Sequence, residues 1–206
     1  MKNIIIFLLL CLTTGCFTVE EAEYKVITKD GSFELREYSP HILAETEVEG
    51  SLEDAGDKAF RPLFNYISGE NQSKKEIAMT APVSQEAASE KIVMTAPVGQ
   101  QRGDKGWKIS FMMPKDYTME TLPKPNNPKV KLRQVPSQQM ASVEYSGFWS
   151  EENYSENLAK LNSWTDSKGF KKVGDPIWAR YNPPFTLWFL RRNEILIPVE
   201  SSKKTK

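Results

Sequence analysis

Two stretches of this chain present the same kinds of residue in the same order, and this recurrence limits the folds open to the chain. The corresponding residues, all separated by one constant offset, are Glu34-Leu-Arg-Glu37 with Lys131-Leu-Arg-Gln134, Ala44 with Ala141, Glu47 with Glu144, and Gly50 with Gly147. The economical interpretation is an internal duplication of a strand–strand–helix–strand–strand unit. Because neither unit could bury its sheet alone, we expect an α+β fold: a distorted antiparallel β-barrel with two helices and a pseudo-twofold axis.

Apolar and polar residues alternate in several short runs, which is typical of half-buried strands. The strands expected on this basis are 24–29, 32–38, 41–48, 107–113, 176–181 and 187–199. Asp30-Gly31, between the first two, is a strong two-residue hairpin signal. Residues 117–128 are rich in proline and asparagine, so we interpret them as an extended connection between halves at about 24–116 and 128–200.

Each half also predicts one helix. Ser51, with Asp54 three residues later, is typical of a helix N-terminus, and Ser150 stands in the corresponding place of the second half. Pro62 lies inside the first helix and predicts a kink. The apolar stripe expected to face the sheet is Leu52, Ala55, Ala59, Phe60, Leu63, Phe64 and Ile67 in the first helix, and Tyr154, Leu158, Leu161 and Trp164 in the second.

A seven-residue phrase occurs twice, as Ile77-Ala-Met-Thr-Ala-Pro-Val83 and as Ile92-Val-Met-Thr-Ala-Pro-Val98. Each copy is short and apolar, which predicts a strand, and its proline restricts it to an edge or a bulge. The two copies could form a hairpin whose Met and Val side chains fill the core. Alternatively, methionine adapts to flat and irregular shapes, so the copies could line a ligand site.

The doubled Met-Thr-Ala-Pro-Val resembles the signature of the SOUL haem-binding family, in the form found in its bacterial and plastid-type branch. Further matching motifs, in the same order along the chain, are Phe33-Glu-Leu-Arg-Glu-Tyr38, Trp107-Lys-Ile-Ser-Phe-Met-Met-Pro114, Tyr145-Ser-Gly-Phe148, Tyr181-Asn-Pro-Pro184 and Arg191-Arg-Asn-Glu194. The similarity runs from about Tyr24 to about Val199. It implies the same pseudo-twofold α+β barrel, which is also seen in bacterial effector-binding domains.

The family resemblance implies haem or another planar hydrophobic small molecule in a cleft between the first helix and the loop before the last strand. The residues that fall in this cleft are Phe60, Arg61, Leu63, Phe64, Pro183, Pro184, Phe185 and Trp188. Where animal members carry cations for the propionates, this chain has Asp57, Asn65 and Thr186, so we expect Arg61 or Lys58 to substitute. The position of an axial histidine in one animal branch falls on Glu37, which leaves His41, the only histidine, as a weak candidate for the iron.

The first fifteen residues have the features of a secretory signal peptide. Lys2 precedes an apolar run, Ile4–Leu12, that is too short to span a bilayer, and small residues follow it. Cys16 comes directly after them, as at the lipidated cysteine of bacterial lipoproteins, although Thr13 replaces the usual leucine. An ordinary cleaved signal and an uncleaved anchor remain open alternatives.

We therefore expect residues 1–15 to be removed, 16–23 to link a lipidated Cys16 to the domain at 24–200, and 201–206 to form a disordered tail. Phe17 stands where an aspartate would retain a lipoprotein in the inner membrane. The expected location is the cell envelope, lipid-anchored at the outer membrane and facing the periplasm.

Composition argues against several other functions. The 27 basic residues balance 27 acidic ones, so the chain has no basic excess for nucleic acid. Both cysteines, Cys11 and Cys16, lie in or next to the leader, and His41 is the sole histidine, so no His/Cys metal site or catalytic triad is expected. We expect a non-enzymatic tetrapyrrole carrier or scavenger. The alternatives are a partner-docking lipoprotein without haem, or a hydrolase using Glu144 and Tyr145.

Overall fold

The computed structural model of the protein describes residues 19–73 and 89–201. Its helices are α1 (Leu52–Ile67) and α2 (Glu151–Ser167), with a single 3-10 turn, η1 (Trp188–Leu190). Its strands are β1 (Tyr24–Asp30), β2 (Phe33–Tyr38), β3 (His41–Val48), β4 (Asn71–Gln72), β5 (Val98–Arg102), β6 (Trp107–Met112), β7 (Lys124–Pro125), β8 (Lys131–Val135), β9 (Gln138–Tyr145), β10 (Phe170–Lys172), β11 (Ile177–Arg180) and β12 (Asn193–Ser201).

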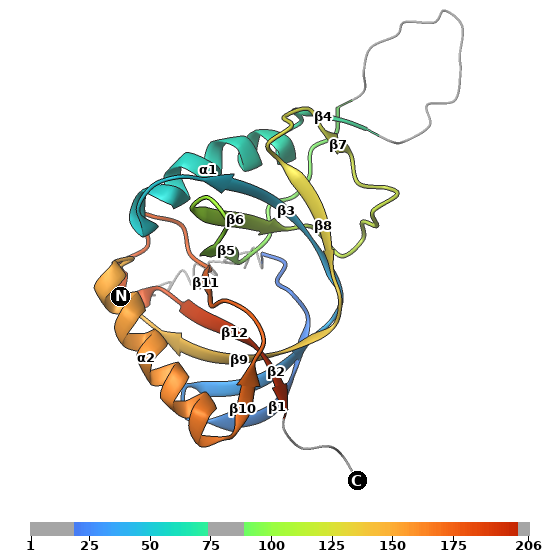
Figure 1. Ribbon diagram of the computed structural model, residues 1–206. Coiled ribbons are helices and arrows are strands. Elements are labelled where there is room, and N and C mark those ends of the chain that lie inside the picture. The colour runs from blue at the N-terminus through green and yellow to red at the C-terminus, as the bar shows by residue number, and fades with distance from the viewer. Residues whose placement is uncertain (1–18, 74–88, 202–206) are drawn as a thin grey trace, which may run out of the picture.

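One large antiparallel sheet organises the fold, in the order β1-β2-β9-β12-β11-β5-β6-β3-β8, with β10 added beside β12. The sheet curves strongly, and both helices lie on its outer side (Figure 1). Among the described strands the path is open, because β1 and β8 at its ends are not paired with each other. The α+β class with two helices is therefore confirmed, whereas the strands within 19–73 and 89–201 do not close into a barrel.

The two halves begin their helices in the same way. Ser51 Oγ accepts a hydrogen bond from the backbone N–H of Asp54 at 3.1 Å, and Ser150 Oγ accepts one from Asn153 at 3.3 Å. Each cap satisfies a backbone donor that the first turn leaves unpaired. The α1 helix continues through Pro62 to Ile67. These shared features agree with an internal duplication, which remains a prediction.

Alternation along the strands separates two faces of the sheet. On the helix side, α1 packs on a core that includes Ile109 and Trp178, and α2 packs on a second core that includes Ile195 and Ile197. On the opposite side lies a smaller cluster of Tyr38, Met140, Ala179 and Leu196. Since neighbours such as Trp178 and Ala179 belong to different faces, both sides of the sheet are available for a site.

Two strand predictions were wrong. The second copy of the repeated phrase, Ile92–Val98, reaches a strand only at Val98, and its Ala96 makes one isolated bridge with Glu21. The prediction for residues 187–199 holds only from Asn193 onward, because the preceding residues form η1 and a loop. The first copy of the phrase, residues 77–83, lies outside the described residues.

The segment before β1 is part of the fold. Glu20 accepts a hydrogen bond from the backbone of Ala96 at 2.9 Å, and the Glu23 carbonyl accepts one from Ser39 at 2.9 Å. The Lys115 backbone N–H donates to the Glu20 carboxylate at 2.7 Å. We call residues 19–23 the N-terminal strap. Over 19–73 and 89–201, the longest helices are too short or too polar to cross a lipid bilayer.

Candidate functional site

The α1 residues predicted to bind a ligand lie partly in the core and partly on the surface. Leu63 is fully buried in the core under α1, whereas Arg61 is exposed. Phe60 and Phe64 are 40% and 44% exposed, and their rings stack with centroids 5.5 Å apart and planes 15° apart. The expectation that both phenylalanines belong to the buried stripe was therefore wrong, because both are exposed at its edge. Together they form a flat aromatic pair, and Phe60 also packs against the ring of Phe111.

The loop between β11 and β12 carries the other predicted residues. Pro183 and Pro184 are exposed, and Phe185 is 86% exposed. Trp188, in η1, stacks on Phe148 with ring centroids 5.4 Å apart and planes 21° apart. Leu187, Phe189 and Leu190 are also exposed, so the loop presents a large apolar surface to solvent.

Arg180 joins these two surfaces. Its guanidinium lies against α1 at Gly56, where an added Cβ would come within 2.6 Å of Nη2. Its Cζ lies 5.3 Å from the Trp149 ring, and the Cζ of Arg191 lies 4.4 Å from the same ring. Arg191 in turn donates to the Thr186 carbonyl at 2.8 Å. The chain of contacts thus runs from α1 through two arginines and a tryptophan to the loop.

The Nε atom of Arg180 is buried without a hydrogen-bond partner, and so are two neighbouring polar atoms, Trp178 Nε1 and the Tyr145 hydroxyl. The Trp178 indole is close enough to the Tyr145 hydroxyl to interact with it, but the two do not meet the geometry of a hydrogen bond. Burial lowers the pKa of Arg180 to about 10, against the opposing charge of Asp57, so this side chain is cationic at neutral pH. Unpaired buried donors are rare and costly, which makes this a place where an acceptor from outside would be stabilised.

Sequence reasoning missed Arg180 as the cation of this region. Arg61 is exposed on α1, and Lys58 donates instead to the Glu49 carbonyl at 3.3 Å. A signal was available, since Arg180 directly precedes the Tyr181-Asn-Pro-Pro184 motif. Only the fold shows that β11 places its side chain under α1.

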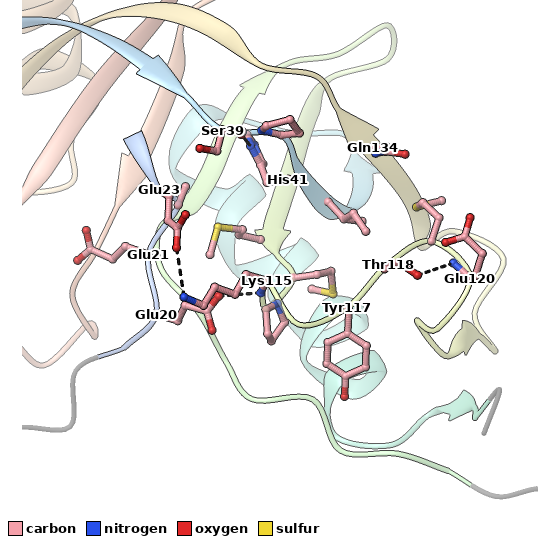
Figure 2. Close-up of a pocket in the computed structure, with 17 residues that line it drawn as sticks. Glu20, Glu21, Glu23, Ser39, His41, Lys115, Tyr117, Thr118, Glu120 and Gln134 are labelled. Atoms are coloured by element: carbon pink, nitrogen blue, oxygen red, sulfur yellow. Dashed lines mark hydrogen bonds and ion pairs between the residues drawn. The ribbon is translucent and has the colours of Figure 1, made fainter. Parts of the chain in front are cut away.

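His41 lies elsewhere, on the opposite face of the sheet. It lines a pocket of about 390 Å³, the outer pocket, which Figure 2 shows. It also lines a second, smaller space of about 80 Å³, the inner pocket. His41 therefore does not face the surface formed by Phe60, Arg180 and Trp188. In the part of the chain that the structure describes, no three His, Cys, Asp or Glu side chains converge as metal ligands.

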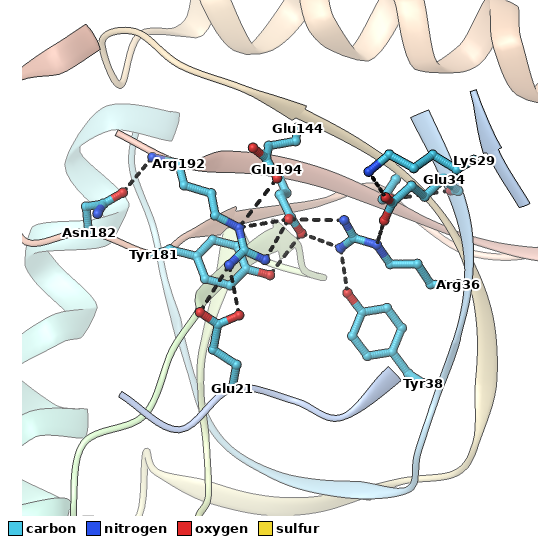
Figure 3. A network of polar contacts seen from close by, with 11 residues as sticks. Glu21, Lys29, Glu34, Arg36, Tyr38, Glu144, Tyr181, Asn182, Arg192 and Glu194 are labelled. Carbon is cyan, nitrogen blue, oxygen red and sulfur yellow. Dashed lines mark hydrogen bonds and ion pairs between the residues drawn. The ribbon is translucent and has the colours of Figure 1, made fainter. Parts of the chain in front are cut away.

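A network of buried charges surrounds Glu194, which is fully buried (Figure 3). Its carboxylate accepts hydrogen bonds from Arg36 at 2.7 and 3.2 Å, from Arg192 at 2.9 and 3.1 Å, and from the Tyr181 hydroxyl at 2.9 Å. Burial would lower the pKa of Arg36, but the hydrogen bond and charge of Glu194 raise it above its ordinary value. Because the carboxylate is occupied by these donors, we interpret the network as a structural one.

The residues considered for a hydrolase are not arranged for catalysis together. Glu144 is exposed, and it lies 3.7 Å from Arg192. Tyr145, its neighbour on β9, belongs to the opposite face and packs against the core under α1. Burial raises the pKa of the Tyr145 hydroxyl, which keeps it protonated.

The model of one protein family, described as SOUL heme-binding protein, matches residues 19–198. The chain belongs to the SOUL heme-binding protein family. The match covers nearly all of the residues that the structure describes. It begins with the N-terminal strap and includes both helices, Arg180 and the β11–β12 loop.

Two relatives with curated names agree with this SOUL assignment. Heme-binding protein 1 of Xenopus tropicalis is 26% identical over 190 residues, which covers 85% of this chain and 94% of the relative. Heme-binding protein 2 of Homo sapiens is 27% identical over 179 residues, with 85% and 82% of the two chains covered.

Solved structures share the fold of this SOUL protein at low sequence identity. A structure described as a hydrolase from Listeria innocua matches with a TM-score of 0.58 and 14% identity, covering 84% of this chain and 94% of that one. The EcmrR C-terminal domain matches with a TM-score of 0.56 and 14% identity, covering 86% and 98%. These similarities concern the fold alone.

Proposed function

We propose that this SOUL protein binds haem or a related tetrapyrrole, without catalysing a reaction, on the surface between α1 and the β11–β12 loop. The observation that carries the proposal is the buried, unpaired Nε of Arg180, a half-buried cation that lies against α1 at Gly56 and 5.3 Å from the Trp149 ring. Family membership and the names of the relatives support the ligand class.

The residues of this surface fit the chemistry of such a ligand. The macrocycle is flat and apolar, and the stacked faces of Phe60 and Phe64 offer a matching surface. Its carboxylates need cations or hydrogen-bond donors, which Arg180 and Arg191 supply. Covering about 400 Å² of apolar ring at roughly 25 cal/mol per Å² gives on the order of 10 kcal/mol before ordering costs, so binding does not require an axial ligand. When bound, haem would supply redox or gas-binding chemistry at its iron.

The cellular role that we propose is a carrier or scavenger tethered to the bacterial cell envelope through Cys16. The supporting features are the apolar leader and the small residues that precede this cysteine. Mass spectrometry of the protein purified from membranes would test the tether, because a diacylated N-terminus at Cys16 gives a defined mass increase. A mature protein that begins elsewhere, without lipid, would contradict it.

The ligand proposal is tested by titrating the domain with hemin and following the Soret band. Replacing Phe60 and Phe64 by aspartate removes the aromatic pair and adds charge that repels the carboxylates. We expect the affinity to fall by at least about 100-fold, equivalent to ~2.7 kcal/mol. Circular dichroism of each variant would establish that it remains folded.

The matched control replaces Val26 and Val173 by aspartate. These are exposed apolar residues on β1 and next to β10, so the variant carries the same change of charge and polarity elsewhere on the surface. Hemin affinity should be unchanged in it. Equal losses in the two variants, or an unchanged Soret titration in the Phe60/Phe64 variant, would refute the proposed surface.

A further inference from the structure

The inner pocket lies on the face of the sheet opposite the helices, and the outer pocket adjoins it where β3 begins and β6 ends. They share three lining residues, Ala22, His41 and Met112, so His41 and Met112 stand at the boundary between them. Their combined size suits a small organic molecule, with one part in each space. The surface proposed for the tetrapyrrole lies on the other side of the sheet, so the two sites are separate.

The inner pocket is apolar. Its lining includes the whole of the small hydrophobic cluster on this face: Tyr38, Met140, Ala179 and Leu196. The polar ends of the charged and phenolic side chains here are already engaged. Arg133 pairs with Glu45 at 2.6 Å, and the Tyr181 hydroxyl donates to Glu194 at 2.9 Å. This lining therefore favours a hydrophobic ligand part.

The outer pocket is acidic. Its lining includes Glu20, Glu21, Glu23 and Glu120, but Lys115 as the sole lysine or arginine. The Glu21 carboxylate pairs with Arg192 at 2.9 Å, and Figure 2 shows it pointing away from the other lining side chains. Of the remaining carboxylates, Glu23 pairs with the Lys115 ammonium group at 3.2 Å, whereas Glu20 accepts from the uncharged Lys115 backbone N–H at 2.7 Å, so the lining has an excess of negative charge. This charge opposes a carboxylate-bearing tetrapyrrole and favours a cation.

His41 adds a hydrogen-bond acceptor at the boundary. Its Nδ1 lies 2.9 Å from the Ser39 carbonyl, which can only accept, so Nδ1 carries the proton. Burial lowers the pKa of the imidazole, as does the charge of Arg133, although the Ser39 carbonyl opposes them. The neutral ring therefore offers Nε2 as an acceptor to an N–H donor of a ligand.

We propose that the two pockets form a second ligand site, which takes an amphipathic organic cation. Its apolar body occupies the inner pocket beside Met140 and Leu196. Its cationic nitrogen lies in the outer pocket beside Glu20 and Glu23. The N-terminal strap supplies these two carboxylates and is thus one wall of the site.

Isothermal titration calorimetry with thioflavin T, a flat aromatic cation, tests the proposal. Its neutral analogue without the ring N-methyl group serves as the ligand control. The protein variant is Glu20→Gln with Glu23→Gln, in which each amide oxygen can still accept the hydrogen bond from Lys115. Removing two carboxylates near a partly solvated cation should weaken binding about tenfold.

The matched protein control is Glu152→Gln with Glu156→Gln, two exposed carboxylates on α2. It changes the net charge by the same amount without touching either pocket. We expect one thioflavin T per chain, with affinity unchanged in this control and much weaker binding of the neutral analogue. Hemin affinity should be the same in both variants and unaffected by saturating thioflavin T.

Four results would overturn the second site. They are no binding of thioflavin T at millimolar concentration, equal affinity for the neutral analogue, an equal effect of the two double variants, and competition with hemin. Competition would place the cation on the tetrapyrrole surface instead. Failure of hemin to bind, with thioflavin T still bound as expected, would count against the proposed function and leave the second site supported.

Discussion

The buried network around Glu194 allows a quantitative prediction for Glu194→Gln. The substitution keeps the shape of the side chain but removes the negative charge that Arg36 and Arg192 share. Arg36 is 2% exposed, so its charge would remain buried with weaker compensation. Its other carboxylate partner, Glu34 at 2.7 Å, also pairs with Lys29 and cannot replace Glu194 fully.

Breaking a buried ion pair by removing one partner costs about 3–5 kcal/mol. We expect the lower part of this range, ~3 kcal/mol, because glutamine retains one acceptor oxygen. For a domain of this size the midpoint of thermal unfolding should fall by about 6–12 °C. Urea unfolding followed by tryptophan fluorescence would give the free energy of unfolding, and a thermal scan the midpoint.

The control is Glu23→Gln, which removes an ion pair with Lys115 whose side chains are 65% and 64% exposed. Exposed pairs contribute about 0–1 kcal/mol, so this variant should be nearly as stable as the parent. If Glu194→Gln loses no more stability than Glu23→Gln, the network does not stabilise the fold in the way we describe.

Four further predictions concern the two sites and the stability of the fold. Arg180→Gln should weaken hemin binding about tenfold yet leave the affinity for protoporphyrin dimethyl ester unchanged, as measured by absorbance titration; equal losses would mean that Arg180 does not contact the carboxylates. His41→Ala should leave the Soret maximum of bound hemin in place, and a shift would show that the imidazole reaches the iron. Gly31→Ala should cost about 1 kcal/mol in urea unfolding, since this residue has φ of 62°, and an unchanged midpoint would contradict that. Burial raises the pKa of Tyr38 and Tyr154 to about 12. The stability that their protonated hydroxyls give the fold is therefore complete below pH 10 and is lost as the pH rises toward 12. The free energy of unfolding should fall by roughly 2–5 kcal/mol over that interval, and a flat profile would refute the assignment.

Local sequence signals predicted several of the regular elements, although β8 and the central strand β9 were not among the strands expected. The β1–β2 hairpin, β3, β6 and both helix starts were expected at or near their observed bounds, because turn residues, alternation and serine caps act over a few neighbouring positions. Gly31 at the hairpin and Gly69 after α1 have positive φ, as their places in the pattern indicate.

Long-range packing decided the rest. The apolar stripe of α1 is wider than the surface beneath it, so Phe60 and Phe64 emerge from its edge. Residues 187–190 are all apolar, so they show no alternation of apolar and polar side chains. Such a run is compatible with a strand or with an exposed loop. The position of Arg180 under α1 depends on β11 lying between β5 and β12, and no local pattern encodes that order.

The N-terminal strap has a practical consequence for anyone who prepares this domain. A recombinant chain cut at Tyr24, where regular alternation begins, would lack the Glu21 carboxylate that accepts from Arg192 at 2.9 and 3.1 Å. It would also lose the backbone bridge to Ala96 and one side of the outer pocket. If this shortened protein folds, the face of the sheet opposite the helices would be more exposed to water. Ligand titrations of it would then not report the affinity of the full domain.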